Sequence, residues 1–114
     1  MATISSHILD TISGISAAGI PVQLVRLDSN EKTVLFDIEA DNEGRINEQL
    51  DIDIDAEYEL VFHSARYFSS QGISDAIENT MPTVVLRFSM PDNRKRYHKP
   101  IMLSPHSYSV WWSE

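Results

Sequence analysis

The stretch Val22-Gln23-Leu24-Val25-Arg26-Leu27-Asp28, together with Thr33-Val34-Leu35-Phe36-Asp37-Ile38-Glu39 after the next turn, decides the fold class. Both are short runs rich in apolar and β-branched residues, which is typical of strands. Comparable runs recur along the chain and predict eight strands: Ser6–Asp10, Val22–Asp28, Thr33–Glu39, Arg45–Glu48, Glu57–His63, Thr83–Met90, Tyr97–Leu103 and Tyr108–Trp112. The pattern indicates an all-β sandwich or barrel with antiparallel meanders or Greek-key connections.

Turn-forming residues separate these runs, namely Gly14, Gly19 and Pro21, the cluster Asp41–Gly44 and the cluster Pro91–Asn93. The segment Ser64–Gly72 differs, because it lacks alternation and ends in a glycine suited to close a helix. Ser64 is suited to be its N-cap. We therefore expect one short helix there, and a single domain over residues 1–114.

Composition excludes several functions. The chain has no cysteine, so a disulfide, a thiolate metal site and a cysteine nucleophile are all impossible. A net charge of −8 argues against nucleic acid and anionic membranes as partners. The first seven residues do not resemble a leader peptide, and no apolar run approaches membrane-spanning length, so we expect a cytoplasmic protein. A chain this short is expected to need a second subunit to form a deep pocket.

The run Asp51-Ile52-Asp53-Ile54-Asp55 superficially resembles the start of a calcium loop. Such a loop needs glycine at its sixth position and a bidentate glutamate at its twelfth, where this chain has Ala56 and Phe62. We therefore predict an amphipathic lead-in to a strand, and no metal ion.

Two of the four histidines, His7 and His98, alternate with apolar neighbours on predicted strands. An ordinary pKa near 6.5 equips histidine for proton transfer, although a single histidine on a strand is more often structural. His63 and His106 receive no functional role. Arg45 follows the Asp41–Gly44 turn, where it could form an ion pair with Asp41 or Glu43, or recognise an anion or imide through its planar fork of donors.

The adjacent pair Trp111 and Trp112 would direct its two indoles to opposite faces of a sheet. One indole can pack in the core, while the other has to cover a ligand, a partner subunit or another surface. The basic cluster Arg94–Arg96 with Lys99 is interpreted as a solvated hairpin turn, with capture of an acidic ligand as the alternative.

Six blocks in order closely resemble the transthyretin-like family, and specifically its 5-hydroxyisourate hydrolases. The blocks are Ser6–Thr11, Ala17–Val22, Asn42–Arg45, Tyr58–His63, Tyr67–Phe68 and Tyr97–Pro105. The resemblance implies an eight-stranded Greek-key sandwich with one short helix, assembled as a homotetramer, a dimer of dimers. It also implies that His7, Arg45 and His98 line a central channel and hydrolyse 5-hydroxyisourate, a product of purine breakdown, with no metal or organic cofactor.

The chain departs from that family at its end. The hydrolases carry a C-terminal Tyr-Arg-Gly-Ser, whereas this chain has Trp111-Trp112-Ser113-Glu114 after the retained Tyr108-Ser109. We expect Tyr108, Trp111, Trp112 and Ser113 to contact the substrate. Replacing arginine by tryptophan removes a cation that would help to hold an anionic or imide substrate.

Three hypotheses follow for the function. The first is a hydrolase in which one histidine is the base, Arg45 stabilises the oxyanion and the other histidine protonates the departing nitrogen. The second is a repurposed enzyme whose aromatic channel condenses or cyclises a planar substrate. The third is a non-catalytic carrier of a small ligand, against which the retained histidines and arginine count.

Overall fold

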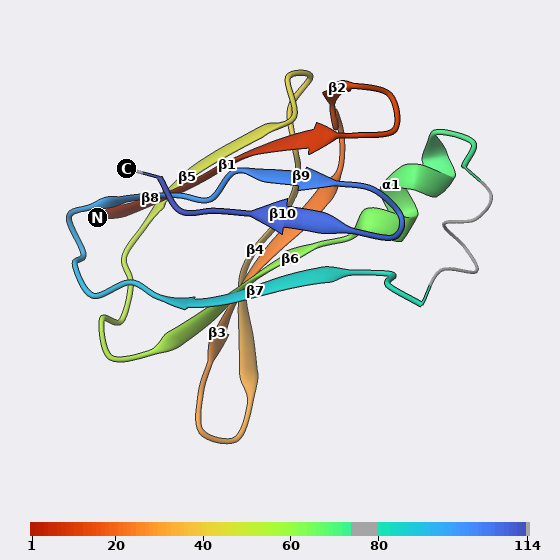
Figure 1. The fold of residues 1–114 in the computed structure, drawn as a ribbon. Coiled ribbons are helices and arrows are strands. Elements are labelled where there is room, and N and C mark those ends of the chain that lie inside the picture. Colours follow the sequence, from red (N-terminus) through yellow and green to blue (C-terminus); the bar gives the residue numbers. More distant parts are fainter. Residues whose placement is uncertain (74–79, 114) are drawn as a thin grey trace.

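The computed structural model describes residues 1–73 and 80–113, which form a sandwich of two sheets with one helix at its end (Figure 1). One sheet contains β1 (Ala2–Asp10), β2 (Ile15–Ser16), β5 (Arg45–Leu50), β8 (Arg96–His98), β9 (Ile101–Leu103) and β10 (Tyr108–Val110). The other contains β3 (Pro21–Leu27), β4 (Lys32–Glu39), β6 (Glu57–Phe62) and β7 (Val84–Ser89) in the order β4-β3-β6-β7. The helix α1 (Ser64–Ser70) follows β6. The predicted all-β class is confirmed.

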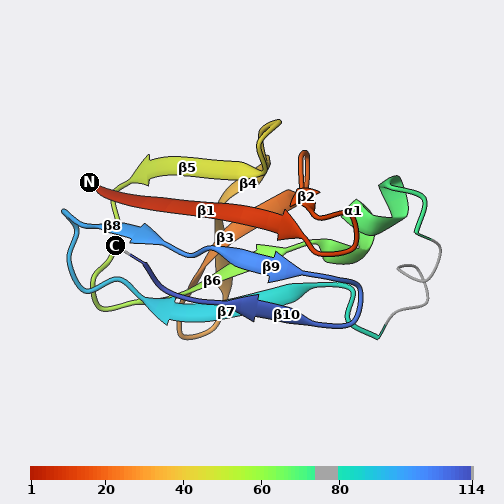
Figure 2. The same ribbon diagram turned by 45° about the horizontal axis from the view of Figure 1, so that its top comes forward.

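Strand β1 is the centre of the first sheet (Figure 2). It pairs antiparallel with β5 on one side, and parallel with β8 and then β9 on the other. Its even-numbered residues face the second sheet, and Ile4 and Ile8 are fully buried there against a core that includes Leu24 and Phe62. Its odd-numbered residues face outward, which places Ser5 and His7 on the outer face of the sandwich.

The strands differ from the prediction at several points. The predicted strand Tyr108–Trp112 ends at Val110, so both tryptophans lie beyond it. β1 begins at Ala2 rather than Ser6, and the short β2 is additional. The predicted strand Tyr97–Leu103 is divided at Lys99 and Pro100, because proline has no backbone N–H to donate to the ladder. There the Ser6 hydroxyl donates to the Lys99 carbonyl oxygen at 2.6 Å, which keeps β1 bonded across the break.

The predicted helix is confirmed as Ser64–Ser70, with Gln71 as its C-cap and Gly72 at the closing position that the sequence predicted. The predicted N-cap is wrong: His63 occupies that position and makes no capping bond through its side chain. The Ser64 hydroxyl lies instead 3.4 Å from the Pro82 carbonyl oxygen. The end was predicted correctly, because Gly72 adopts a φ of 80° while its N–H donates to Ser69 O and the N–H of Ile73 donates to Phe68 O.

A buried hydrogen bond ties the helix to the end of β1. The Tyr67 hydroxyl donates to Asp10 Oδ2 at 2.8 Å, and the backbone N–H groups of Ile12 and Ser13 donate to Asp10 Oδ1. Burial by itself raises the pKa of Asp10, but these hydrogen bonds outweigh burial and the pKa is lowered. Burial and the Asp10 carboxylate raise the pKa of Tyr67. No helix among the described residues is long and apolar enough to cross a membrane.

The turn before β5 requires a glycine. Gly44 has a φ of 71°, and a Cβ atom there would lie 2.7 Å from the Ile8 carbonyl oxygen and 2.9 Å from the Ala17 nitrogen. The same turn is closed by Asp41 Oδ1, which accepts the backbone N–H of Arg45 at 3.0 Å. Arg45 is therefore placed by a tight approach between the turn and β1.

Substituting Tyr67→Phe should lower the free energy of unfolding at pH 7 by about 1–3 kcal/mol, because the buried Asp10 carboxylate loses a donor. A lowered folded-state pKa contributes stability above the unfolded value near 3.9, and this stability is lost as the pH falls through the folded value. The cost of the substitution should therefore shrink below about pH 4. In the matched control Tyr97→Phe, the lost hydroxyl contacts only the backbone of Asp92. The measurement is urea unfolding of both variants at pH 7 and pH 3.5. The prediction is wrong if the loss of unfolding free energy changes with pH to the same extent in Tyr67→Phe and Tyr97→Phe.

Gly44→Ala should destabilise the protein by at least about 1 kcal/mol more than Gly14→Ala. Both glycines have positive φ, but a Cβ atom at Gly14 would meet nothing within 4 Å, so the control isolates the crowding at Gly44. Equal shifts in urea midpoint would show that β5 moves away from β1 without cost.

Candidate active site

The registers of β1 gather the three predicted catalytic residues on the outer face of its sheet. His7 lies directly opposite Arg45 in the antiparallel pair of β1 and β5. His98 lies opposite Ser5, two residues before His7, in the parallel pair of β1 and β8. Because residues two apart on a strand share a face, all three side chains emerge on the same side.

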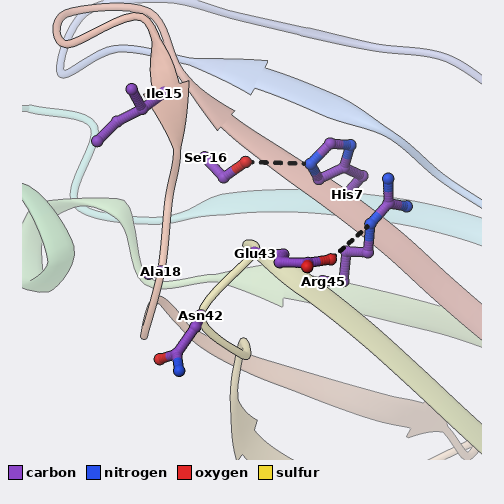
Figure 3. A pocket seen from close by; sticks show the side chains of 7 residues that line it. All are labelled: His7, Ile15, Ser16, Ala18, Asn42, Glu43 and Arg45. Atoms are coloured by element: carbon purple, nitrogen blue, oxygen red, sulfur yellow. Dashed lines mark hydrogen bonds and ion pairs between the residues drawn. The ribbon is translucent and has the colours of Figure 1, made fainter.

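His7 and Arg45 line a pocket of about 450 Å³, together with Ile15, Ser16, Ala18, Asn42 and Glu43. Figure 3 shows that the side chains of His7, Ser16, Glu43 and Arg45 gather on one side of this pocket, with Asn42 at the other end. His7 Nε2 lies 3.2 Å from the Ser16 hydroxyl. Ser16 has no motif that marks it in the sequence, because it reaches His7 only through the fold-back of β2 onto β1.

Arg45 forms the ion pair with Glu43 that the sequence left open, with 3.9 Å between Arg45 Nε and Glu43 Oε2. The side chains are 48% and 80% exposed, so the pair contributes little to stability. The backbone N–H groups of Glu43 and Arg45 both bond to Asp41, and these bonds lower the pKa of the Asp41 carboxyl. The backbone of Arg45 is thus fixed while its guanidinium can exchange Glu43 for another anion.

His98 is held from the opposite side of β1. Its Nδ1 lies 2.8 Å from the Ser5 hydroxyl oxygen. The same oxygen accepts a hydrogen bond from Arg96 Nε–H at 3.2 Å. Burial lowers the pKa of His98, and the positive charges of Arg96 and Arg45 lower it further. These effects all favour the neutral form of the ring. Sequence reasoning missed Ser5, although its position two residues before His7 on an alternating strand put it on the same face.

The C-terminal tail continues alongside β8 and β9. Beyond β10, the N–H of Trp111 donates to Pro100 O at 3.3 Å and the N–H of Ser113 donates to His98 O at 3.0 Å. The tail backbone thus reaches His98, but the described residues that line the His7–Arg45 pocket include none of the four predicted substrate-binding residues, Tyr108, Trp111, Trp112 and Ser113. Glu114 lies outside the described residues.

Trp112 lies beside Lys99, although 58% of its surface is exposed. Its ring centre lies 5.6 Å from Lys99 Nζ, and the ring centre of Phe88 lies 5.1 Å from the same atom. Lys99 is only 8% exposed, and its burial lowers the pKa of the ammonium. Trp112 also lines a second hollow of about 350 Å³ with Lys95, Arg96 and Tyr97. One tail indole therefore covers a buried cation through cation–π contact.

The described residues contain no group of three or more His, Asp or Glu side chains that could hold a metal ion. The site presents two imidazoles and a guanidinium on one sheet face. Such a set can move a proton and stabilise a developing oxyanion.

The comparisons agree with the fold. The model of the HIUase/Transthyretin family matches residues 4–112. The protein named 5-hydroxyisourate hydrolase 2 from Rhizobium meliloti (strain 1021) is 32% identical over 95% of this chain and 92% of its own. A crystal structure of (S)-allantoin synthase matches with a TM-score of 0.81 and 25% identity. The match covers 99% of this chain and 44% of that longer chain. Klebsiella pneumoniae 5-hydroxyisourate hydrolase has a TM-score of 0.81 and 24% identity over 100% of both chains. With a family match over almost its whole length, the chain belongs to the HIUase/Transthyretin family.

Proposed function

We propose that the protein hydrolyses 5-hydroxyisourate, or a close relative of it, by opening a cyclic amide. The observation that carries this proposal is the pairing of His7 with Arg45 across one pocket, with His98 on the same sheet face. The name of the Rhizobium meliloti relative supports the same substrate.

The reaction is the addition of water to a ring carbonyl, followed by cleavage of the carbon–nitrogen bond. One histidine accepts a proton from water as the water oxygen bonds to the carbonyl carbon. Arg45 donates to the oxygen that becomes negative, and it can do so because Glu43 holds it weakly. A proton then passes from a histidine to the departing ring nitrogen, which leaves a carboxylate and an N–H. The balance requires no oxidant and no metal.

We further propose that the active unit is a homotetramer. The His7–Arg45 pocket lies on an open sheet face, and Met102 of β9 exposes apolar surface on the same face. Tyr108 of the edge strand β10 and Trp111 just beyond it are exposed as well. A facing subunit would cover this surface and exclude water from the pocket. Light scattering that shows a stable monomer at micromolar concentration would overturn this assembly.

The repurposed enzyme with an aromatic channel receives less support from the structure. Trp112 lies against Lys99 rather than over the His7–Arg45 pocket. Any aromatic narrowing of the site therefore depends on Trp111 alone.

Alanine substitutions of His7, Arg45 and His98 should each lower kcat/KM for 5-hydroxyisourate by about a hundredfold or more, with unchanged circular dichroism. The double substitution of both histidines should lose less than the product of the single losses, because the two act in one reaction. His106→Ala is the matched control, since His106 is exposed in the turn between β9 and β10 and does not line the pocket. Activity should also fall on the acid side of the ordinary histidine value of about 6.5, as His98 with its lowered pKa takes up a proton. Small, independent losses and a flat profile from pH 5 to 8 would refute the assignment.

Restoring Tyr-Arg-Gly-Ser at positions 111 to 114 should raise hydroxyisourate hydrolysis only when Lys99 is also replaced. With Lys99 present, Trp112→Arg would bring a second cation against a buried ammonium, and the repulsion should destabilise the tail. With Lys99→Val, the arginine no longer faces a like charge.

The comparison therefore uses four proteins: the native chain, the restored tail, Lys99→Val alone, and the restored tail with Lys99→Val. We expect the largest kcat/KM in the fourth and the lowest thermal midpoint in the second. If the native chain already equals the fourth, the tail residues are neutral for this substrate.

A further inference from the structure

Ser5 is almost fully buried, with 2% of its surface exposed, although it lies on the outer face of β1. The side chains of Arg96 and His98, from β8, both contact its hydroxyl. Ser5 is therefore the point at which β1 holds the His98 ring.

The protons at this junction can be assigned from the donor inventory. A guanidinium nitrogen only donates, so Arg96 Nε–H occupies one lone pair of Ser5 Oγ at 3.2 Å. If His98 Nδ1 donated as well, the buried Ser5 O–H would have no acceptor among the described residues. An unmade hydrogen bond of this kind costs about 1–3 kcal/mol. If Ser5 donates to Nδ1 across the 2.8 Å contact, all three groups are satisfied.

The backbone carbonyl of Ser5 is the competing acceptor for a proton on His98 Nδ1. Its effect, which raises the pKa of His98, is the smallest of those acting on the ring. This oxygen already accepts the Lys99 N–H at 2.9 Å. When Ser5 Oγ–H donates to His98 Nδ1, every donor at this junction therefore has an acceptor. A neutral imidazole with a bare Nδ1 carries its proton on Nε2.

We infer that Ser5, oriented by Arg96, is a positioning residue that holds His98 as the Nε2–H tautomer, so that His98 acts as a hydrogen-bond donor and His7 as the base. This inference rests on the proposed hydrolysis. A neutral Nε2–H can donate to the developing oxyanion beside Arg45 without releasing its proton. His7 then takes the proton from water and returns it to the departing nitrogen, so the proton balance closes on one histidine.

The tautomer is measured directly by long-range 1H–15N correlation NMR on 15N-labelled protein at pH 7.5. We expect His98 to show a protonated Nε2 and a bare Nδ1. In Ser5→Ala the signals should move toward the Nδ1–H form, because only the Ser5 carbonyl remains as a partner, and Ser5→Thr should restore the native signals. Arg96→Met should shift the tautomer in the same direction as Ser5→Ala.

Kinetics complete the test. Ser5→Ala should lower kcat by about 10- to 100-fold with little change in KM, since outright loss of one oxyanion donor costs about 10²–10³. Ser6→Ala is the matched control: its hydroxyl is equally buried on the same strand but donates to the Lys99 carbonyl oxygen, so it should leave the His98 signals in place.

A protonated Nδ1 in the native protein, or Ser5→Ala signals and kcat equal to native, would overturn the inference. The NMR measurement needs no substrate. If 5-hydroxyisourate is not turned over while His98 is the Nε2–H form that Ser5 controls, the proposed function fails and the positioning by Ser5 stands.

Discussion

The hydrogen-bond register of β1 between β5 and β8 is the constraint on which the rest of the structure depends. The side chains of a strand alternate, so a slip of one residue would turn Ile4 and Ile8 to the outer face and place Ser5 and His7 in the apolar core. Burying one large aliphatic side chain is worth about 1.5–3 kcal/mol, and burying an unpaired histidine or serine opposes folding. The core therefore selects the same register that aligns His7 with Arg45, and packing and chemistry are not independent choices in this sheet.

Charge is distributed unevenly over the molecule. The chain as a whole carries −8, yet His98 lies within reach of the positive charges of Arg96 and Arg45. A negatively charged or imide ligand is thus attracted only at short range, after it has entered the outer face of the first sheet. Burial lowers the pKa of His98 most, and the same two cations lower it further. Attraction of an anion and a lowered imidazole pKa therefore share one electrostatic arrangement.

Local rules predicted much of the fold, because hairpins and helix ends are determined by neighbouring residues. Gly72 is an example: a glycine adopts positive φ readily, and this property alone was enough to predict the end of α1. Ser64 was misassigned as an N-cap because its hydroxyl bonds to residues far along the chain. The contact of Ser5 with His98 joins positions 93 residues apart through parallel pairing, and no local pattern encodes it. The direction of Trp112 was equally inaccessible, because it depends on the cation that Lys99 places between the sheets.

Trp111 and Trp112 are the chain's two tryptophans, and both lie beyond the last strand. Indole emission is therefore a local probe of the tail, whereas the buried aromatic residues of the core are tyrosines and phenylalanines. If the Trp112 ring leaves Lys99 while the sheets stay paired, emission changes and the far-ultraviolet circular dichroism does not. A mismatch between those two probes on heating would record fraying of the tail and would not by itself show that the sandwich melts through an intermediate.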